Sequence, residues 1–380
     1  MVYDFVVLGA TGMQGKIVAK DLLENGYSVL LSGRDKSRIE HLLKRYKKSE
    51  FEYVDVSDGK RTVDVLKDSG AKIAVNCVEG DWDLKVLESC IKAGVHSLDL
   101  GSDIPMTKDQ LAKDSILKKK GLIHITGCGS VPGIGNVMLN YAANKFDKIE
   151  SAEVGFAWDS NIKKFVVPFS IQSIIEEFTA PAPMVLHEKI VKVKPMDSLV
   201  KCYHRAIGRE KQFNVGHHPE TYTFFKFCKD KGIKNVKFFA GFPDHSFERI
   251  NDMIELGFGR MEKIDFNGIK IVPVEFLTRT LKDLRIPEGY EETENLWVEI
   301  ANKEKNILME CIVPTLKGWE DAGCNVDTGM PASIMAQMVK NDIIKSPGSY
   351  SPEEIVPWEP FFKELRKREM IVYQNGKIIN

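Results

Sequence analysis

The fold is decided by residues 4–40, which read DFVVLGATGMQGKIVAKDLLENGYSVLLSGRDKSRIE. The stretch opens with a short apolar run, DFVVLG, rich in β-branched residues, as a strand buried on both faces requires. It continues as MQGKIVAKDLLENG, in which apolar residues recur at helical spacing until Gly26, and then as a second strand, YSVLLSGR. The stretch therefore predicts a strand, a helix and a parallel strand, with glycines at the first turn.

Three glycines, Gly9, Gly12 and Gly15, follow the first strand with the spacing G-x-x-G-x-x-G. Gly9 permits a tight turn, Gly12 lets a pyrophosphate approach the backbone, and Gly15 lets the helix pack on the strand. Free N–H groups at the helix start would then face the phosphates, whereas an ordinary turn needs no such spacing. We predict a dinucleotide site formed by this loop and by the ends of other strands: Gly9, Thr11, Gly12, Met13, Gln14, Gly15, Ser32, Arg34, Asp55, Cys77, Val78 and Gly129.

The end of the second strand indicates which dinucleotide binds. NAD enzymes usually carry Asp or Glu at this place, where the carboxylate holds the ribose hydroxyls. Here the chain reads Ser32-Gly33-Arg34-Asp35, which presents a hydroxyl and a guanidinium suited to a 2′-phosphate. We therefore predict NADP as the cofactor, with NAD possible because Asp35 lies just beyond the tip.

The bulk composition excludes several function classes. The 380 residues carry a formal net charge of −1, so no basic surface directs the chain to nucleic acid or to an anionic membrane. The start lacks a basic region, and no apolar run approaches the roughly 18–20 residues of a membrane-spanning helix. Seven cysteines lie far apart without a C-x-x-C pair, which favours reduced thiols and a cytoplasmic protein.

Strands and helices alternate to about residue 130, which predicts a Rossmann-type doubly wound parallel sheet over residues 1–130. From about residue 150 the pattern changes, and we expect residues 131–328 to form a second, α+β domain with an open mixed sheet. Its predicted strands include residues 185–195 and 266–276, and residues 295–314 read as an antiparallel hairpin with NKEKN as the turn.

The segment GHHPETYTFF concentrates polar side chains at His217, His218 and Glu220. A metal site would need converging ligands, and adjacent histidine side chains tend to diverge. We therefore predict no metal here, and favour a substrate-facing loop with Glu220 capping the helix that follows.

The loop GCGSVPGIGNVMLNYAA, residues 127–143, together with the N-terminal glycine loop, resembles the saccharopine dehydrogenase-like superfamily. Residues 173–196, 238–258 and 327–370 resemble further segments of that superfamily, in the same order. One departure concerns the substrate: saccharopine reductases carry Asp-Pro-Gly and then Asp-His where this chain has Val131-Pro132-Gly133 and then Gly135-Asn136. An apolar residue before Pro-Gly is nearer to the lysine 6-dehydrogenases.

The resemblance implies an NAD(P)-dependent oxidoreductase that transfers hydride at a C–N centre of an amino acid or amine, such as lysine or saccharopine. It implies His245 as the first candidate for the acid or base, with Asp103 or Glu177 second, and either Glu176 or Glu177 facing the cleft. It also implies that residues 329–380 return to the first domain, and that the second domain's open sheet pairs across a homodimer.

Two other functions remain open. Tyr141 and Lys145 fit Y-x-x-x-K, with Ser130 upstream, as in short-chain reductases and epimerases that act at a C–OH carbon. An extra strand, VHSLDL, argues against this alternative because that family has one long helix at this place. The other alternative is a catalytically silent NADP-binding regulatory protein. Cys128 lies in the same loop and is expected to be a small buried hydrophobe.

Overall fold

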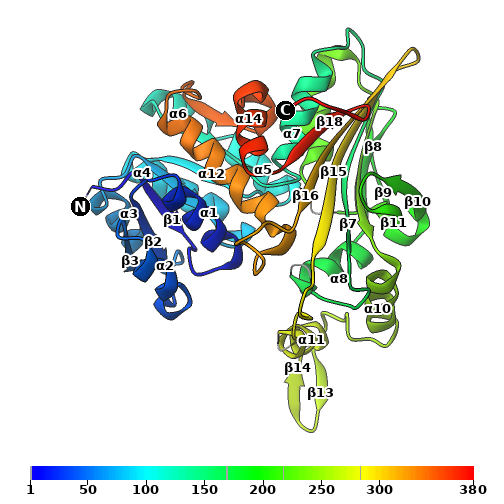
Figure 1. The fold of residues 1–380 in the computed structure, drawn as a ribbon, viewed down its shortest axis with the longest axis horizontal. Coiled ribbons are helices and arrows are strands. Elements are labelled where there is room, and N and C mark those ends of the chain that lie inside the picture. The colour runs from blue at the N-terminus through cyan, green and yellow to red at the C-terminus, as the bar shows by residue number, and fades with distance from the viewer. Residues whose placement is uncertain (1, 168–169, 217, 283) are drawn as a thin grey trace.

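The computed structural model describes residues 2–167, 170–216, 218–282 and 284–380. In Figure 1 the N-terminal part, in blue and cyan, lies beside a second part in green and yellow. The last segment of the chain, in orange and red, runs between the two parts.

Seven parallel strands among the described residues form the first sheet, in the order β17-β6-β5-β4-β1-β2-β3. Apart from β17, this is the strand order of a dinucleotide-binding fold, so the predicted doubly wound sheet is confirmed. Its strands are β1 (Phe5–Leu8), β2 (Val29–Gly33), β3 (Ser49–Tyr53), β4 (Ile73–Asn76), β5 (His96–Asp99), β6 (Ile123–Ile125) and β17 (Gly348–Tyr350).

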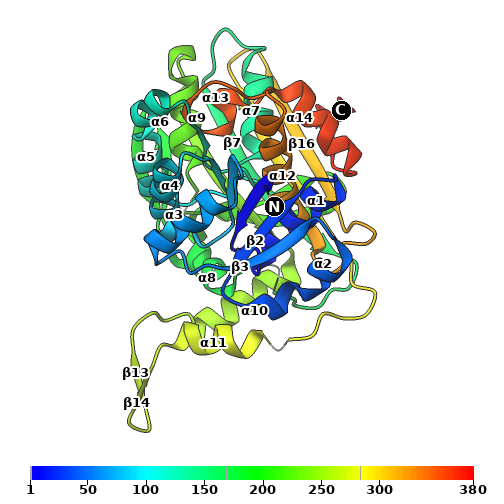
Figure 2. The ribbon, with the colours of Figure 1, turned by 90° about the vertical axis from the view of Figure 1, so that its left-hand side faces the viewer.

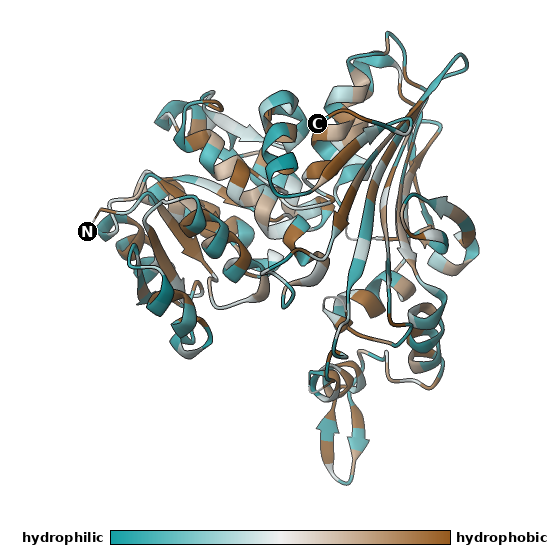
Figure 3. Cartoon of the chain, in the orientation of Figure 1, coloured by the Kyte–Doolittle hydropathy of each residue, from teal (hydrophilic) through white to brown (hydrophobic). Residues whose placement is uncertain are grey.

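Helices cover both faces of this sheet because its strands are apolar on both sides. In β1, Phe5 and Val7 pack with α1 and α12, while Val6 and Leu8 pack with α3 and α4 on the opposite face. Figure 3 shows these apolar strands in brown between helices with much hydrophilic surface in teal. The helices of this part are α1 (Met13–Glu24), α2 (Glu40–Arg45), α3 (Gly59–Asp68), α4 (Asp83–Ala93), α5 (Ile104–Leu111), α6 (Asp114–Lys120) and α12 (Val326–Lys340).

The second sheet is mixed, in the order β10-β11-β12-β7-β15-β16-β18-β19, while β8 pairs with β12, and β9 pairs with β8. Its strands are β7 (Ser151–Ser160), β8 (Ala182–Leu186), β9 (Lys189–Val193), β10 (Val200–His204), β11 (Gly208–Asn214), β12 (Asn235–Phe242), β15 (Glu292–Ala301), β16 (Asn306–Pro314), β18 (Ile371–Gln374) and β19 (Lys377–Ile378). The helices of this part are α7 (Ile134–Ala143), α8 (Ile171–Thr179), α9 (Glu220–Cys228), α10 (Asp244–Glu255), α11 (Pro273–Leu281), α13 (Pro352–Ile355) and α14 (Trp358–Lys367).

The predicted hairpin over residues 295–314 is confirmed by the antiparallel pairing of β15 with β16. The predicted strand over residues 185–195 is instead two strands, β8 and β9. His187 and Glu188 both adopt positive φ between them, at 49° and 64°, as a two-residue hairpin turn requires. Neither residue is a glycine, so the sequence carried no turn signal.

The predicted strand over residues 266–276 is also divided. A short two-stranded hairpin, β13 (Ile264–Phe266) and β14 (Ile269–Ile271), is followed directly by α11. Pro273 stands at the first turn of that helix, where its missing N–H costs nothing. Figures 1 and 2 show the β13–β14 hairpin projecting from the body of the molecule.

The predicted return of residues 329–380 to the first domain needs correction. Helix α12 packs on α1, and β17 pairs in parallel with β6. The last strands do not follow, because β18 pairs with β16 of the second sheet and β19 pairs with β18. The C-terminal segment therefore contributes a strand to the first sheet and two strands to the second.

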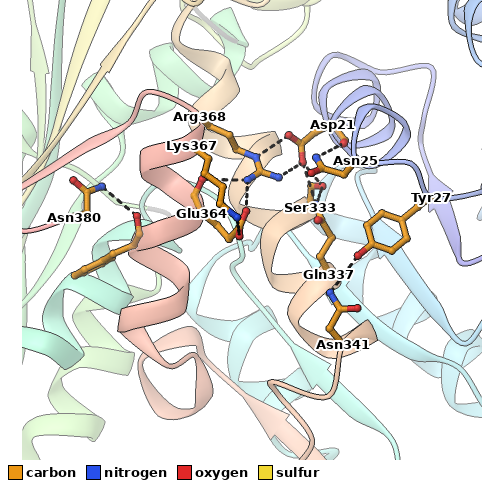
Figure 4. A network of polar contacts seen from close by, with 11 residues as sticks. Asp21, Asn25, Tyr27, Ser333, Gln337, Asn341, Glu364, Lys367, Arg368 and Asn380 are labelled. Atoms are coloured by element: carbon orange, nitrogen blue, oxygen red, sulfur yellow. Dashed lines mark hydrogen bonds and ion pairs between the residues drawn. The ribbon is translucent and has the colours of Figure 1, made fainter.

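A buried polar network ties this segment to the first helix (Figure 4). The guanidinium of Arg368 donates to both carboxylate oxygens of Asp21, over 2.8 and 2.9 Å. Ser333 of α12 donates its hydroxyl to the same carboxylate over 2.6 Å, and Arg368 also donates to Glu364 of α14. Three helices are thus joined at Asp21.

Candidate active site

A cleft of about 270 Å³ opens at the carboxyl ends of β1, β2 and β4, where dinucleotides bind in such folds. The glycine loop fits closely there. A Cβ on Gly9, which has φ of 77°, would lie 2.8 Å from the carbonyl oxygen of Cys77. A Cβ on Gly15 would lie 2.2 Å from the carbonyl oxygen of Gly9. The cleft is lined by Gly9, Thr11, Gly12, Gly33, Arg34, Arg38, Val54, Asp55, Val56, Cys77, Val78, Glu79 and Trp82.

Two guanidinium groups, those of Arg34 and Arg38, line the outer end of this cleft. The carboxylate of Asp35 is occupied elsewhere, because it accepts hydrogen bonds from the backbone N–H and the hydroxyl of Ser37. These hydrogen bonds lower the pKa of Asp35. A pair of arginines, with the carboxylate of Asp35 turned into its own loop, fits a 2′-phosphate.

Two predicted cofactor residues are placed differently from expectation. Ser32 is fully buried and donates its hydroxyl to the carbonyl oxygen of Val7 over 3.1 Å, so it does not face the cleft. Met13 is 48% exposed at the start of α1 and lines a shallow depression with Lys16 and Lys20. In both cases the local geometry of the strand or helix turns the side chain away.

A second cavity, of about 390 Å³, lies where the ends of β5 and β6 meet the second sheet and α12. Gln14 and Gly129, predicted to bind cofactor, line this cavity rather than the first cleft. The lining is Gln14, Leu100, Gly101, Ser102, Gly129, Ser130, Val131, Pro132, Phe156, Trp158, Ser173, Glu177, His218, Glu292, Glu294, Cys324, Asn325, Asp327 and Thr328.

The loops that form the floor of this cavity are held by Asp99 at the end of β5. Its carboxylate accepts the backbone N–H groups of Gly101 and Gly127, each over 2.9 Å. It also accepts from the side chains of Thr126 and Gln110. One buried carboxylate therefore sets the positions of both loops.

His218 lies between two carboxylates at the wall of the cavity. Its Nε2 is 3.7 Å from Oε1 of Glu177, and its Nδ1 is 3.8 Å from Oε2 of Glu220. The imidazole stacks on Phe238 with ring centroids 3.7 Å apart, and its Nδ1 lies 3.2 Å from the carbonyl oxygen of Val131. Burial alone would lower the pKa of His218, but the two carboxylates together raise it. Burial also raises the pKa of Glu220 to about 7.

The cavity lining carries three further acids. Glu292 and Glu294 are two apart on β15, so both point to the same face. Glu292 is satisfied, because its Oε1 accepts the backbone N–H of Cys324 over 2.7 Å and its Oε2 lies 3.2 Å from the Tyr290 hydroxyl. Glu294 instead meets the carboxyl group of Asp327, from the start of α12. Burial, and then this proximity, raises the pKa of Glu294.

The structure does not bring all the predicted catalytic residues together. Glu177 of α8 lines the cavity, while its neighbour Glu176 is half-buried and accepts from Gln172. His245, our first candidate, is outside the lining: it contacts the edge of Trp158, with its Nδ1 4.0 Å from Asp159. It stands on the first turn of α10, which packs beyond Trp158.

Asp103 is also outside the lining, because its carboxylate caps α5 by accepting the N–H of Met106. Glu220 does not cap its helix; its carboxyl group is buried and has no hydrogen-bond partner among the described residues. Cys128 is fully buried, with its thiol 3.4 Å from the carbonyl oxygen of Ile125. His217 lies outside the described residues. Within those residues, no group of three His, Cys, Asp or Glu side chains is placed to hold a metal ion.

Sequence reasoning missed Glu294 and Asp327. The alternation of Glu292 and Glu294 at the start of a strand that continues as Leu-Trp-Val was a usable signal, because two acids on the buried face of a sheet need a reason to be there. Asp327 carried no such signal, since an acid at the start of a helix is common.

Comparison with known proteins places the chain. Residues 5–125 match the saccharopine dehydrogenase NADP binding domain, and residues 129–371 match the saccharopine dehydrogenase C-terminal domain. The chain belongs to the saccharopine dehydrogenase family. It is therefore an oxidoreductase with an NADP-binding domain, and the cleft with Arg34 and Arg38 fits that cofactor.

Two similar proteins extend this assignment. The apo, histidine-tagged saccharopine dehydrogenase (L-Glu forming) of Saccharomyces cerevisiae has the same fold, with a TM-score of 0.77 and 14% identity over 100% of both chains. The carboxyaminopropylagmatine dehydrogenase of Synechocystis is 24% identical over 387 residues, which cover 95% of this chain and 94% of that relative. In the described part of this family member, no helix is both long and apolar enough to span a membrane.

Proposed function

We propose that this saccharopine dehydrogenase family member exchanges hydride at a C–N carbon of a cationic amine, an amino acid or polyamine derivative. One observation carries the proposal. The cavity beside the nucleotide cleft is lined by four carboxyl groups and His218, and the described residues that line it include no lysine or arginine. Such a lining attracts amines and disfavours anions.

The same lining separates substrates within the family. Saccharopine carries several carboxylates, which would meet Glu177, Glu292, Glu294 and Asp327 with no lysine or arginine among the described lining residues to pair with them. Lysine or an aminoalkyl-guanidine derivative carries more positive charge. The Synechocystis relative is named for an agmatine derivative, which supports a cationic substrate over saccharopine for this chain.

The bound NADP would supply the hydride acceptor or donor, and a side chain of the protein would accept or donate one proton at the substrate nitrogen. An amine nitrogen must lose its proton before its carbon can lose hydride. His218 lines the cavity between Glu177 and Glu220, so its neutral imidazole would accept the proton of the substrate amine and the two carboxylates would stabilise the imidazolium that forms. Phe156 and Trp158 are apolar walls that would exclude water from the reacting carbon.

The test is a substrate panel followed by the absorbance of the reduced cofactor. Carboxyaminopropylagmatine, lysine and saccharopine should be offered with NADP⁺, and the first two should be turned over better than saccharopine. His218→Gln should then lower kcat by roughly 10²–10⁴-fold with little change in NADPH affinity.

His245→Gln is the matched control, because His245 contacts Trp158 from outside the cavity lining. A larger loss in His245→Gln than in His218→Gln would contradict the assignment of the proton to His218. NADPH binding without turnover of any substrate in the panel would favour the silent regulatory protein.

A further inference from the structure

The contact between Glu294 and Asp327 is unlike the other acid contacts of the cavity. Asp327 is 2% exposed, and its Oδ1 accepts the hydroxyl of Thr328 over 3.1 Å. Its Oδ2 has no hydrogen-bond donor among the described residues. Glu294 comes from the strand β15, and its carboxyl group is in hydrogen-bond contact with that of Asp327. Two carboxyl groups thus meet inside a cavity wall with one oxygen unsatisfied.

Two carboxyl groups in contact inside a cavity wall disfavour being charged together, so they share one proton unless another cation lies between them. The described residues that line the cavity include no lysine or arginine, and His218 lies between Glu177 and Glu220. Glu292 and Glu177 add negative charge, and the buried thiols of Cys311 and Cys324 are neutral. Burial and mutual repulsion therefore raise the pKa of the pair. Without a bound cation, the two carboxyl groups keep one proton near neutral pH.

We propose that Glu294 and Asp327 form the subsite for the cationic end group of the substrate, a guanidinium or a primary ammonium, which replaces the proton that the two carboxyl groups share. Binding then releases one proton to solvent, as the charge of the pair goes from −1 to −2 and the ligand adds +1. The unsatisfied Oδ2 of Asp327 gains its donor. The subsite rests on the proposed function and deepens it by naming the substrate class, and it leaves His218 to the reacting nitrogen.

Proton release gives a test that needs no turnover. Agmatine, as the guanidinium probe, and 1,5-diaminopentane, as the ammonium probe, should be titrated calorimetrically into the NADP⁺-bound protein at pH 7. Repeating each titration in buffers with different ionisation enthalpies gives the number of protons released. We expect about one proton per ligand for the probe that the subsite takes, and an affinity that rises with pH through the pKa of the pair.

Glu294→Gln and Asp327→Asn should each lower the affinity of that probe about ten-fold or more, and the proton release should disappear in both. Glu299→Gln is the matched control, because Glu299 lies on the same strand but outside the cavity and accepts from Asn306. Thermal unfolding should show that both subsite variants fold, since each replaces a carboxyl group by an amide of the same shape that can still hydrogen-bond to the other carboxyl group.

The two probes separate the sources of the cation: tighter agmatine binding assigns the site to a guanidinium, and tighter diamine binding to an ammonium. Binding without proton release, equal affinity in wild type and Glu294→Gln, or no binding of either probe at millimolar concentration would each overturn the inference. These results are distinguishable from a failure of the proposed reaction, which the substrate panel tests through turnover.

Discussion

The guanidinium of Arg368 binds both carboxylate oxygens of Asp21, although the two residues lie 347 positions apart in the chain. Their side chains are 8% and 5% exposed. Figure 4 shows the pair joining α1, from the first part of the chain, to the C-terminal helix α14 through α12. The C-terminal segment therefore fixes the position of α1, the helix that follows the glycine loop.

Arg368→Ala should destabilise the protein by about 3–5 kcal/mol, because it leaves the buried Asp21 charge without its partner. Denaturant unfolding measures this change. The exposed pair Lys44–Glu40, with side chains 78% and 53% exposed, is the control. Lys44→Ala should cost at most about 0.5 kcal/mol. Equal costs for the two substitutions would contradict the structural role of Arg368.

Arg34→Ala should weaken NADPH binding roughly 10- to 150-fold, because it removes a charge-assisted contact to the 2′-phosphate. NADH binding should barely change, since NADH has no phosphate there. Fluorescence titration with each cofactor measures both affinities. Lys36→Ala, on the same turn but outside the cleft lining, is the control. Parallel losses for the two cofactors would show that Arg34 contacts the adenine instead.

Glu220→Gln should shift the pH dependence of amine oxidation to lower pH. Glu220 and Glu177 raise the pKa of His218, and the neutral imidazole is the form that accepts a proton. Without the Glu220 charge the imidazole loses its proton at lower pH. The acidic limb of the plot of kcat/KM against pH therefore shifts to lower pH. Glu248→Gln, on the exposed side of α10, should leave the limb in place. A limb unmoved by Glu220→Gln would remove His218 from the proton transfer.

Tyr141→Phe should retain activity. The Tyr141 hydroxyl accepts from Lys145 over 2.7 Å and lies 3.1 Å from Gln374 of β18. Its ring packs on Trp358 of α14, with centroids 4.9 Å apart, and neither Tyr141 nor Lys145 lines the cavity. The Y-x-x-x-K pair thus anchors the C-terminal segment to α7. Loss of turnover in a folded Tyr141→Phe variant would favour the short-chain alternative.

The homodimer stays a prediction, and sedimentation at micromolar concentration tests it. The edge strands β9 and β10 expose Ile190 and Tyr203, at 65% and 74%, which a second copy could cover. We expect about twice the chain mass of 42.9 kDa. A monomer at this concentration would contradict the prediction.

The sequence by itself determined the first domain. The run of apolar residues, the glycine spacing and the helical periodicity of residues 4–40 are local features, and each acts on the backbone within a few residues. They were enough to place the βαβ unit, the cleft and Arg34. The prediction that Ser32 binds the cofactor does not fit the structure. Its hydroxyl donates instead to the carbonyl oxygen of Val7 on the neighbouring strand, which the local sequence does not indicate.

Only the tertiary structure decided the cavity. Its walls bring His218 from before α9, Glu294 from β15 and Asp327 from α12 into one lining, and nothing in their sequence spacing indicates this. The same holds for the strand β17, which completes the first sheet from residues 348–350. Packing of distant segments depends on which apolar faces remain uncovered after local structure has formed, and that is a property of the whole chain.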